Sequence, residues 1–127
     1  MPVFLTEQAV LAIHRDQVGV FGGAHGVRDA NLLASAIGQP EQVYAYTGSL
    51  YQAAAAYGVS LARNHPFLDG NKRVAADCML TFLMLNGRRP TMTNTQLFEC
   101  MLRVAVGELE RGPLAEWLEQ NSTVEPL

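Results

Sequence analysis

The sequence predicts an all-α protein, folded as a compact, single-domain bundle of about six helices over residues 1–127. The chain has 127 residues, enough for one domain and too few for two independent cores. Hydrophobic residues make up 49% and charged residues 17%, so a sizeable core can form. Ala and Leu contribute 16 residues each, against 13 for Val and Ile together, which favours helix over sheet.

Glycine and proline divide the chain into segments of helical length. Thr6 is expected to cap a first helix that runs to about Val20. Asp29 is expected to cap a short second helix that ends before Gly38. The spacing of Ser49 and Gln52 is that of a capping box.

The sequence of the C-terminal third predicts two more helices and one short strand. Thr93 and Gln96 again have capping-box spacing, and a helix with one apolar side follows them. A last short helix is marked by Leu114, Trp117 and Leu118. Thr91 to Thr93 is expected to form the short strand.

Two segments are expected at the centre of the bundle. Residues 53–62 are small and apolar, with Gly58 among them, so a neighbouring helix can approach closely. Residues 74–85 are apolar nearly all round, which is typical of a helix surrounded by other helices. The most polar stretch of the chain, residues 63–73, lies between them.

Composition excludes several classes of protein. The net charge of −3 and a pI near 5.5 argue against direct nucleic-acid binding. The apolar run of residues 74–85 is too short to span a bilayer and contains Asp77, and the N-terminus lacks the features of a signal peptide. Cys78 and Cys100 are expected to be core thiols in a reducing compartment. We therefore expect a cytoplasmic protein without a membrane partner.

The polar stretch between the two buried segments has the features of a phosphate site beside a histidine. Pro66 disfavours helix at His65, and Gly70 permits a positive φ, so the turn is tight and its backbone can form an anion-binding nest. Lys72 and Arg73 then open a helix, where cations oppose the helix dipole unless an anion binds there.

A purely structural reading of the same residues stays open. Arg73 and Asp77 have the spacing of a surface ion pair, Phe67 can plug the end of the bundle, and His65 can cap the preceding helix. The chain contains eight arginines and a single lysine, Lys72. A solvated position without a function would more often carry Arg in this chain, so the choice of Lys slightly favours a role in a phosphate site.

Other candidate sites are weaker. His65 and Asp69 can be metal ligands, but Pro66 prevents one helix from presenting both, and no third ligand is evident. His14 and His25 are isolated in the sequence, so we interpret each as a structural or surface residue. The glycine-rich residues 22–26 lack a preceding strand, so they do not form a dinucleotide loop.

The nine residues 65–73, His-Pro-Phe-Leu-Asp-Gly-Asn-Lys-Arg, resemble the signature loop of the Fic/Doc superfamily, close to its Doc (death-on-curing) toxins. The resemblance covers most of the chain, and further Doc-like residues are His14, Phe21-Gly22-Gly23, Gly26-Val27-Arg28-Asp29, Ser35-Ala36-Ile37, Phe82-Leu83 and Asn86-Gly87. It implies the Fic/Doc fold, ATP and Mg²⁺ as cofactors, and transfer of a group to a protein hydroxyl.

The resemblance also implies a role for each residue of the loop. His65 is expected to be the general base, and Asp69 to hold the magnesium ion. Gly70 and Asn71, with the backbone N–H groups that follow, are expected to form the anion nest. Arg73 would clamp phosphate oxygens and Lys72 would add a point charge. Phe67 is expected to anchor the loop in the core. The role of Asp77 is not implied by the resemblance, but we infer that it orients Arg73.

Departures from the Fic pattern favour one reaction over another. Fic enzymes that transfer AMP carry Gly at the position of Lys72 and a second Arg at that of Ala76, whereas Doc toxins share the Lys and lack that Arg. Pro66 and Gly70 depart from the best-known Doc pattern. Transfer of the γ-phosphate of ATP to a threonine is therefore the leading hypothesis, with elongation factor Tu as the target that the resemblance implies. Nucleotide transfer and a catalytically degenerate binding module are the alternatives.

The resemblance also implies a partner that inhibits the toxin. Many Fic enzymes carry an inhibitory helix with Ser or Thr followed four residues later by Glu and then Gly or Asn. Thr95 and Glu99 have that spacing, but Cys100 follows them. Inhibition is therefore expected from an antitoxin whose disordered tail folds into a groove on the toxin.

Overall fold

The computed structural model describes residues 1–126 and confirms the helical fold class. In the described residues the chain forms six helices and two short strands. In chain order these are α1 (Glu7–Phe21), α2 (Ala30–Thr47), α3 (Leu50–Asn64), α4 (Asn71–Leu85), β1 (Arg88–Pro90), α5 (Asn94–Ala105), α6 (Arg111–Gln120) and β2 (Ser122–Val124).

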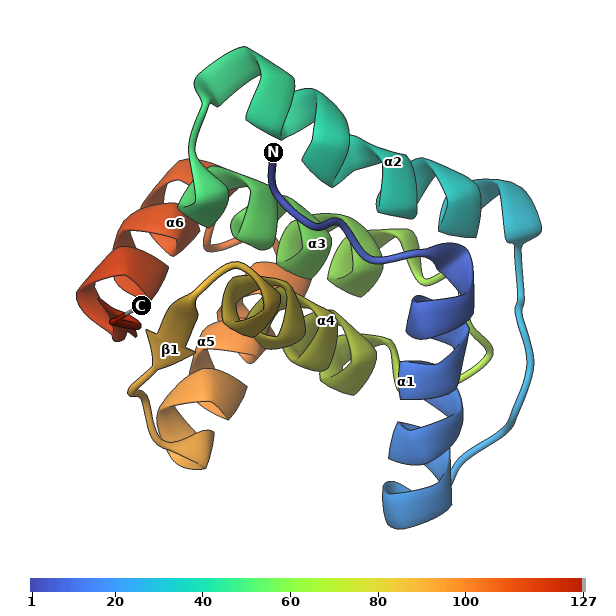
Figure 1. The fold of residues 1–127 in the computed structure, drawn as a ribbon. Helices are drawn as coiled ribbons and strands as arrows, with labels where there is room; N and C mark the ends of the chain where they lie inside the picture. Colours follow the sequence, from blue (N-terminus) through green and yellow to red (C-terminus); the bar gives the residue numbers. More distant parts are fainter. Residues whose placement is uncertain (127) are drawn as a thin grey trace.

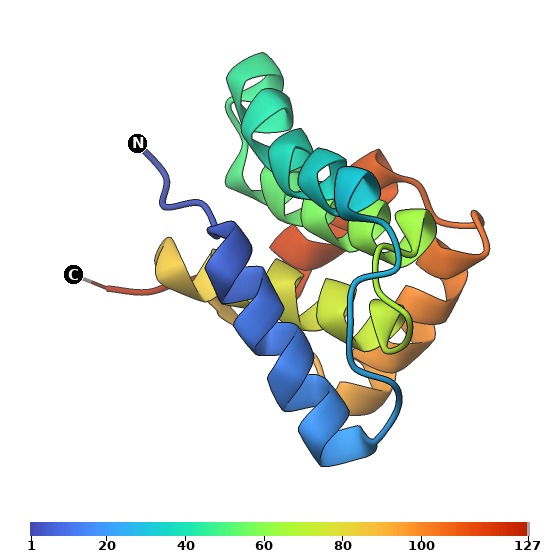
Figure 2. The ribbon, with the colours of Figure 1, turned by 90° about the vertical axis from the view of Figure 1, so that its right-hand side faces the viewer.

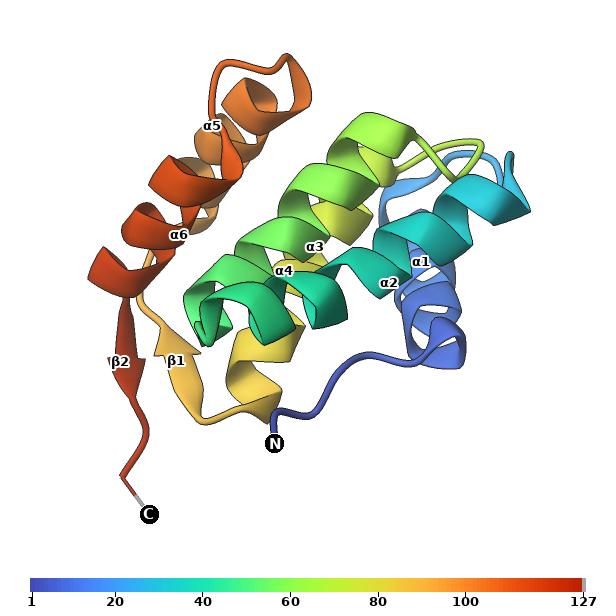
Figure 3. The same ribbon diagram turned by 90° about the horizontal axis from the view of Figure 1, so that it is seen from above.

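Helix α3 lies at the centre and packs against α2, α4, α5 and α6 (Figure 1). Seen from above, α5 and α6 lie on one side of the central helices and α1 lies on the other (Figure 3). Helix α1 packs against α4. The two most apolar segments of the sequence are therefore the two central helices, as expected, and the loop that joins them opens at the α1 side of the bundle.

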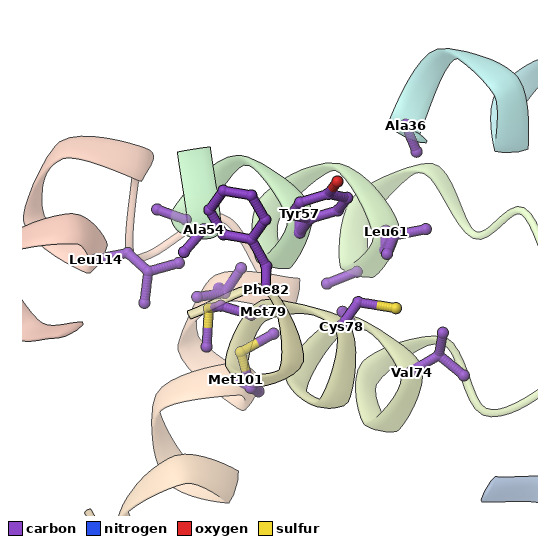
Figure 4. Close-up of a cluster of buried hydrophobic side chains, with 14 of the residues drawn as sticks. Ala36, Ala54, Tyr57, Leu61, Val74, Cys78, Met79, Phe82, Met101 and Leu114 are labelled. Atoms are coloured by element: carbon purple, nitrogen blue, oxygen red, sulfur yellow. The ribbon is translucent and has the colours of Figure 1, made fainter. Parts of the chain in front are cut away.

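The core lies mainly between α3 and α4 (Figure 4). Gly58 allows the close approach, since a Cβ atom there would lie 2.8 Å from the sulfur of Met79. Tyr57 is fully buried, and its hydroxyl accepts a 2.9 Å hydrogen bond from the backbone N–H of Leu5, which ties the N-terminal segment to the core. Cys78 and Cys100 are free, buried thiols, as the sequence predicts.

The predicted helix starts are confirmed at four places. The side chains of Thr6 and Asp29 each accept hydrogen bonds from the first turn of their helix. Ser49 accepts one from Gln52 N–H, while Thr93 and Gln96 form a complete capping box. Each cap satisfies backbone donors that the first turn leaves free.

The prediction that the second helix ends before Gly38 is wrong, because α2 continues through Pro40 to Thr47. Proline lacks the N–H that would bond to the carbonyl of Ala36 four residues earlier. The hydroxyl of Ser60 on α3 lies 3.1 Å from that carbonyl and also reaches the carbonyl of Ala56. A tertiary contact therefore satisfies the acceptor that proline leaves free, and the helix continues.

The predicted strand at Thr91–Thr93 is also misplaced. The strand is Arg88–Pro90, and it pairs antiparallel with Ser122–Val124 near the C-terminus. Thr93 is committed to capping α5, so the extended segment ends before it. In the described residues no helix combines the length and the apolar character that crossing a membrane requires.

Candidate functional site

The loop between α3 and α4 begins with an unusual backbone conformation. His65 follows the last residue of α3 and has φ 50° and ψ 55°, the left-handed region. It is the one residue other than glycine with a positive φ in residues 1–126. Such a conformation costs about 1–3 kcal/mol and persists where surrounding contacts hold it. Pro66 disfavours helix at the preceding residue, so the end of α3 at this point follows from the sequence.

Arg28 holds this backbone from the loop between α1 and α2. Its Nε donates to the carbonyl of His65 at 2.6 Å, and one terminal guanidinium nitrogen donates to the carbonyl of Asn64 at 2.9 Å. The backbone N–H groups of Arg28 and Asp29 both donate to the carbonyl of Pro66, at 2.7 and 3.1 Å. We call these four hydrogen bonds the Arg28 clamp, and they fix the place from which the His65 side chain projects.

The two loops run side by side along a short stretch beyond the clamp (Figure 2). Val27 and Phe67 form an isolated antiparallel bridge, and Leu68 N–H donates to the carbonyl of Gly26 at 3.1 Å. Phe67 is 1% exposed, and its ring stacks on the buried ring of His14 with centroids 4.0 Å apart. The loop is therefore anchored in the core at its middle.

A cleft of about 780 Å³ opens beside the loop, between α1, α4 and α5. His65, Asp69, Gly70, Asn71, Lys72, Arg73 and Asp77 all line it, so the structure brings the predicted site residues together at one place, with Phe67 buried behind them. The rest of the lining comes from three helices, with Gln17 and Phe21 on α1, Ala76 and Leu80 on α4, and Asn94, Leu97, Phe98 and Met101 on α5. The sequence analysis gave none of these residues a role in the site, although it named Phe21 as Doc-like and Ala76 as a departure from the Fic pattern.

The first turn of α4 borders the cleft with free backbone donors. Gly70 precedes the helix in the left-handed conformation, and no side chain caps this end. The N–H groups of Asn71, Lys72 and Arg73 have no partner within the helix, because the first turn of any α-helix leaves them free. With the positive end of the helix dipole, they form the kind of site that binds phosphate.

Two predicted site residues make side-chain contacts that the sequence did not predict. The amide of Asn71 is 9% exposed and bonds both to the N–H and to the carbonyl of Phe67, so its side chain shapes the loop. The carboxylate of Asp77 accepts from Gln17 at 2.8 Å and from Thr81 at 3.1 Å. In residues 1–126 no ion pair joins Asp77 to Arg73, so the expected orienting contact is not the one observed.

Arg73 is positioned by an aromatic ring. Its guanidinium carbon lies 5.1 Å from the centroid of the Phe21 ring, and Phe21 is the last residue of α1. The Nε of Arg73 is buried and has no hydrogen-bond partner in the described structure. A guanidinium held against a ring, with a donor unused and a cleft beside it, is suited to bind an anion.

The carboxylate of Asp69 has one oxygen engaged. Its Oδ1 accepts a 2.9 Å hydrogen bond from the N–H of Gly70. In the described part of the chain no group of three or more His, Cys, Asp or Glu side chains is arranged to hold a metal ion. One carboxylate beside a phosphate nest fits Mg²⁺, which takes few protein ligands and keeps water and substrate phosphates in its shell.

The residues missed by sequence reasoning lie far from the motif along the chain. Of the α5 residues that line the cleft, Leu97 and Met101 belong to the apolar side of that helix. Phe98 is a large apolar residue that is 56% exposed, and only the structure reveals this exposure. Arg28 was among the Doc-like residues, but its position in a loop is equally consistent with a solvated side chain and did not predict that it holds the backbone at His65.

The chain is similar in sequence to two known proteins and to one family model. The chain is 29% identical to "Protein kinase doc" of Escherichia phage P1 over 118 residues, which cover 91% of this chain and 93% of that protein. It is 48% identical to "Toxin Doc" of Mycolicibacterium smegmatis over 71 residues, which cover 53% of this chain and 54% of that protein. The profile described as "Fic/DOC family" matches residues 4–83, which is more than half of the chain and includes the whole loop. The chain belongs to the Fic/DOC family.

Proposed function

We propose that this protein is a Doc-type toxin that transfers the γ-phosphate of ATP to a hydroxyl group of a protein of the translation machinery. The expected acceptor is a threonine of elongation factor Tu. The observation that carries the proposal is the uncapped first turn of α4 at the cleft, with the His65 side chain beside it. The names of the two relatives, a protein kinase and a toxin, support a toxin of the transferase class.

The reaction needs a base next to the transferred phosphate. In the proposed step the acceptor hydroxyl oxygen forms a bond to the γ-phosphorus, the bond from that phosphorus to the β,γ-bridging oxygen breaks, and ADP leaves. The hydroxyl proton passes to an imidazole nitrogen of His65. The Arg28 clamp supports this role because it fixes the backbone from which the imidazole projects.

The phosphate chain is proposed to lie along the first turn of α4. The backbone N–H groups of residues 71–73 and the guanidinium of Arg73 would bind phosphate oxygens. Lys72 is exposed and would contribute a point charge. Asp69 would hold Mg²⁺, which supplies charge neutralisation on the phosphates when it is bound.

A transfer assay with labelled ATP tests the proposal. Purified protein and a His65→Ala variant are incubated with elongation factor Tu and Mg²⁺, with label on either the α- or the γ-phosphate. Label from the γ-position alone, dependent on His65, is the expected result. Label from the α-position would replace the proposal with AMP transfer. If neither label is transferred, repeating the assay in a whole-cell extract separates another target from a binding-only protein.

An antitoxin is the partner that the toxin assignment implies, and we place its tail on the apolar stripe of α5. Phe98, Leu102 and Val106 recur every four residues and are all exposed, by 56%, 41% and 71%. An amphipathic helix that docks there buries its own apolar face against them. The stripe begins at the cleft, where Phe98 is part of the lining, so a bound tail would lie next to the catalytic residues.

Charge substitutions on the stripe test this placement. Leu102→Glu and Val106→Glu lie outside the cleft lining, so they are expected to keep transfer activity and to lose neutralisation by the antitoxin. Tyr46→Glu is the control, because Tyr46 on α2 is 89% exposed and lies elsewhere in the fold. Equal neutralisation of all three variants would place the antitoxin on another surface.

A further inference from the structure

His14 is a buried polar residue on the inward side of α1. Its side chain is 3% exposed, and its ring lies parallel to that of Phe67, with an interplanar angle of 7°. Its Nε2 lies 3.0 Å from the backbone carbonyl oxygen of Asp69. Because a carbonyl oxygen can only accept, Nε2 carries a proton and donates it to this bond.

This hydrogen bond joins α1 to the loop at the peptide that follows Asp69. The same peptide contains the N–H of Gly70, which donates to Oδ1 of the Asp69 side chain. The orientation of the peptide therefore sets the orientation of the carboxylate through two bonds in series. A rotation of the peptide that breaks the bond to His14 also moves the donor that holds Oδ1.

The other side of the carboxylate is confined by Gly23. A Cβ atom built at Gly23 would lie 2.7 Å from Oδ2 of Asp69, so the backbone after α1 approaches the carboxylate closely. Both contacts come from α1 or the residues directly after it. The helix that carries His14 thus positions the acidic residue of the loop from two directions.

We propose that His14 is a positioning residue for the phosphate site: its Nε2–H fixes the Asp69 peptide so that the carboxylate is presented to the bound nucleotide and its metal ion. The inference rests on the proposed function and deepens it. His14 itself is buried behind Phe67 and is absent from the cleft lining among the described residues, so it acts through Asp69.

Two substitutions separate this role from simple packing. His14→Phe keeps an aromatic ring against Phe67 and removes the donor. His14→Gln keeps a side-chain N–H donor of similar reach and removes the stacked ring. If His14 only fills space, the Phe variant is the milder of the two. If its donor positions Asp69, the Gln variant is the milder.

Nucleotide binding provides a readout that does not depend on turnover. A fluorescent ATP analogue is titrated at increasing Mg²⁺ concentrations, with Asp69→Asn as the reference for a lost carboxylate. His14→Phe is expected to raise the Mg²⁺ concentration for half-maximal binding by about tenfold or more, the usual effect of removing a partner that orients a metal ligand. His14→Gln is expected to change it less. Binding without Mg²⁺ is expected to stay the same, because the N–H groups of α4 are untouched.

Hydrogen exchange at the Gly70 amide separates failure of this inference from failure of the proposed function. If the wild-type protein binds no nucleotide, the proposed function fails, yet the exchange rates still test His14. Faster exchange at Gly70 in His14→Phe than in His14→Gln supports the positioning role. Equal exchange in the two variants and the wild type, or an unchanged Mg²⁺ requirement in His14→Phe, overturns it.

Discussion

The side chain of Asn71 and the backbone of Phe67 form a reciprocal pair of hydrogen bonds. Oδ1 accepts from the N–H of Phe67 at 3.0 Å, and Nδ2 donates to its carbonyl at 3.1 Å. The pair closes a ring across the loop from its buried anchor to the first turn of α4. Both partners are buried, so water does not compete for these bonds.

Removing the Asn71 amide is expected to destabilise the protein and to loosen the loop. Asn71→Ala leaves a buried N–H and a buried carbonyl without a partner, which costs about 1–3 kcal/mol for each buried polar group. Asn71→Asp keeps the acceptor for the Phe67 N–H, and at a pH where its carboxyl is protonated the O–H can donate to the Phe67 carbonyl. Its loss of stability at that pH is therefore expected to be smaller than that of Asn71→Ala. Urea unfolding of the two variants measures the difference. A loss below about 0.5 kcal/mol for Asn71→Ala contradicts the assigned role.

A Cβ atom at Gly23 is expected to disturb the site in a way that one at Gly22 does not. Both glycines have a positive φ, of 117° and 82°, so alanine strains the backbone at either position. At Gly23 the new atom also collides with the Asp69 carboxylate, whereas at Gly22 it meets nothing within 4 Å. Gly23→Ala should therefore lose γ-phosphate transfer while Gly22→Ala keeps most of it. Equal losses in the transfer assay would show that strain alone accounts for the effect.

Ser60 and Pro40 are expected to be coupled in stability. Ser60→Ala removes the hydroxyl near the Ala36 carbonyl that Pro40 leaves without an intrahelical donor, at a cost of about 1 kcal/mol. In a Pro40→Ala background the alanine N–H supplies the missing donor, so Ser60→Ala should cost less there. A double-mutant cycle by thermal unfolding measures the coupling. Additive effects would mean that the contact does not support the helix.

Stability is expected to fall at alkaline pH because of Tyr57. Burial raises the pKa of Tyr57 to about 12, against a hydrogen bond from Leu5 N–H that lowers it. The pKa of Tyr57 in the folded protein lies above the unfolded value of 10.0. The protonated hydroxyl therefore makes its full contribution to the free energy of unfolding below pH 10, and this contribution is lost as the pH rises toward 12. The loss amounts to about 2–3 kcal/mol at the end of this window. Denaturation between pH 8 and 12 tests it, and Tyr57→Phe should flatten that part of the curve.

Local signals predicted the starts of the helices and the place of the site. Thr6, Asp29 and Thr93 cap helices as expected, because a side-chain cap depends on residues two or three positions apart. The loop of residues 65–73 could be predicted as a candidate site for the same reason, because its residues are consecutive in the sequence. Those residues line one cleft, whose remaining walls come from the distant helices α1 and α5.

Long-range contacts decided what sequence reasoning could not predict. Helix α2 passes Pro40 because a hydroxyl from another helix is near, and β1 pairs with the strand Ser122–Val124 near the C-terminus. Asp77 was assigned to Arg73 by its spacing on one helix, yet Gln17 from α1 engages it instead. In each case the deciding partner lies more than 20 residues away in sequence.

Because the Arg28 clamp holds the loop, a chain can carry the sequence of the loop without having the loop conformation described above. The hairpin of α3 and α4 carries every residue that the proposed chemistry uses, but the backbone at His65 is held by a residue 37 positions earlier. A related chain that keeps residues 65–73 and loses the equivalent of Arg28 would still match the motif in a sequence search. Its histidine would be free to leave the left-handed conformation. Reading Arg28 together with the loop therefore gives a stricter criterion for an intact site than the loop alone.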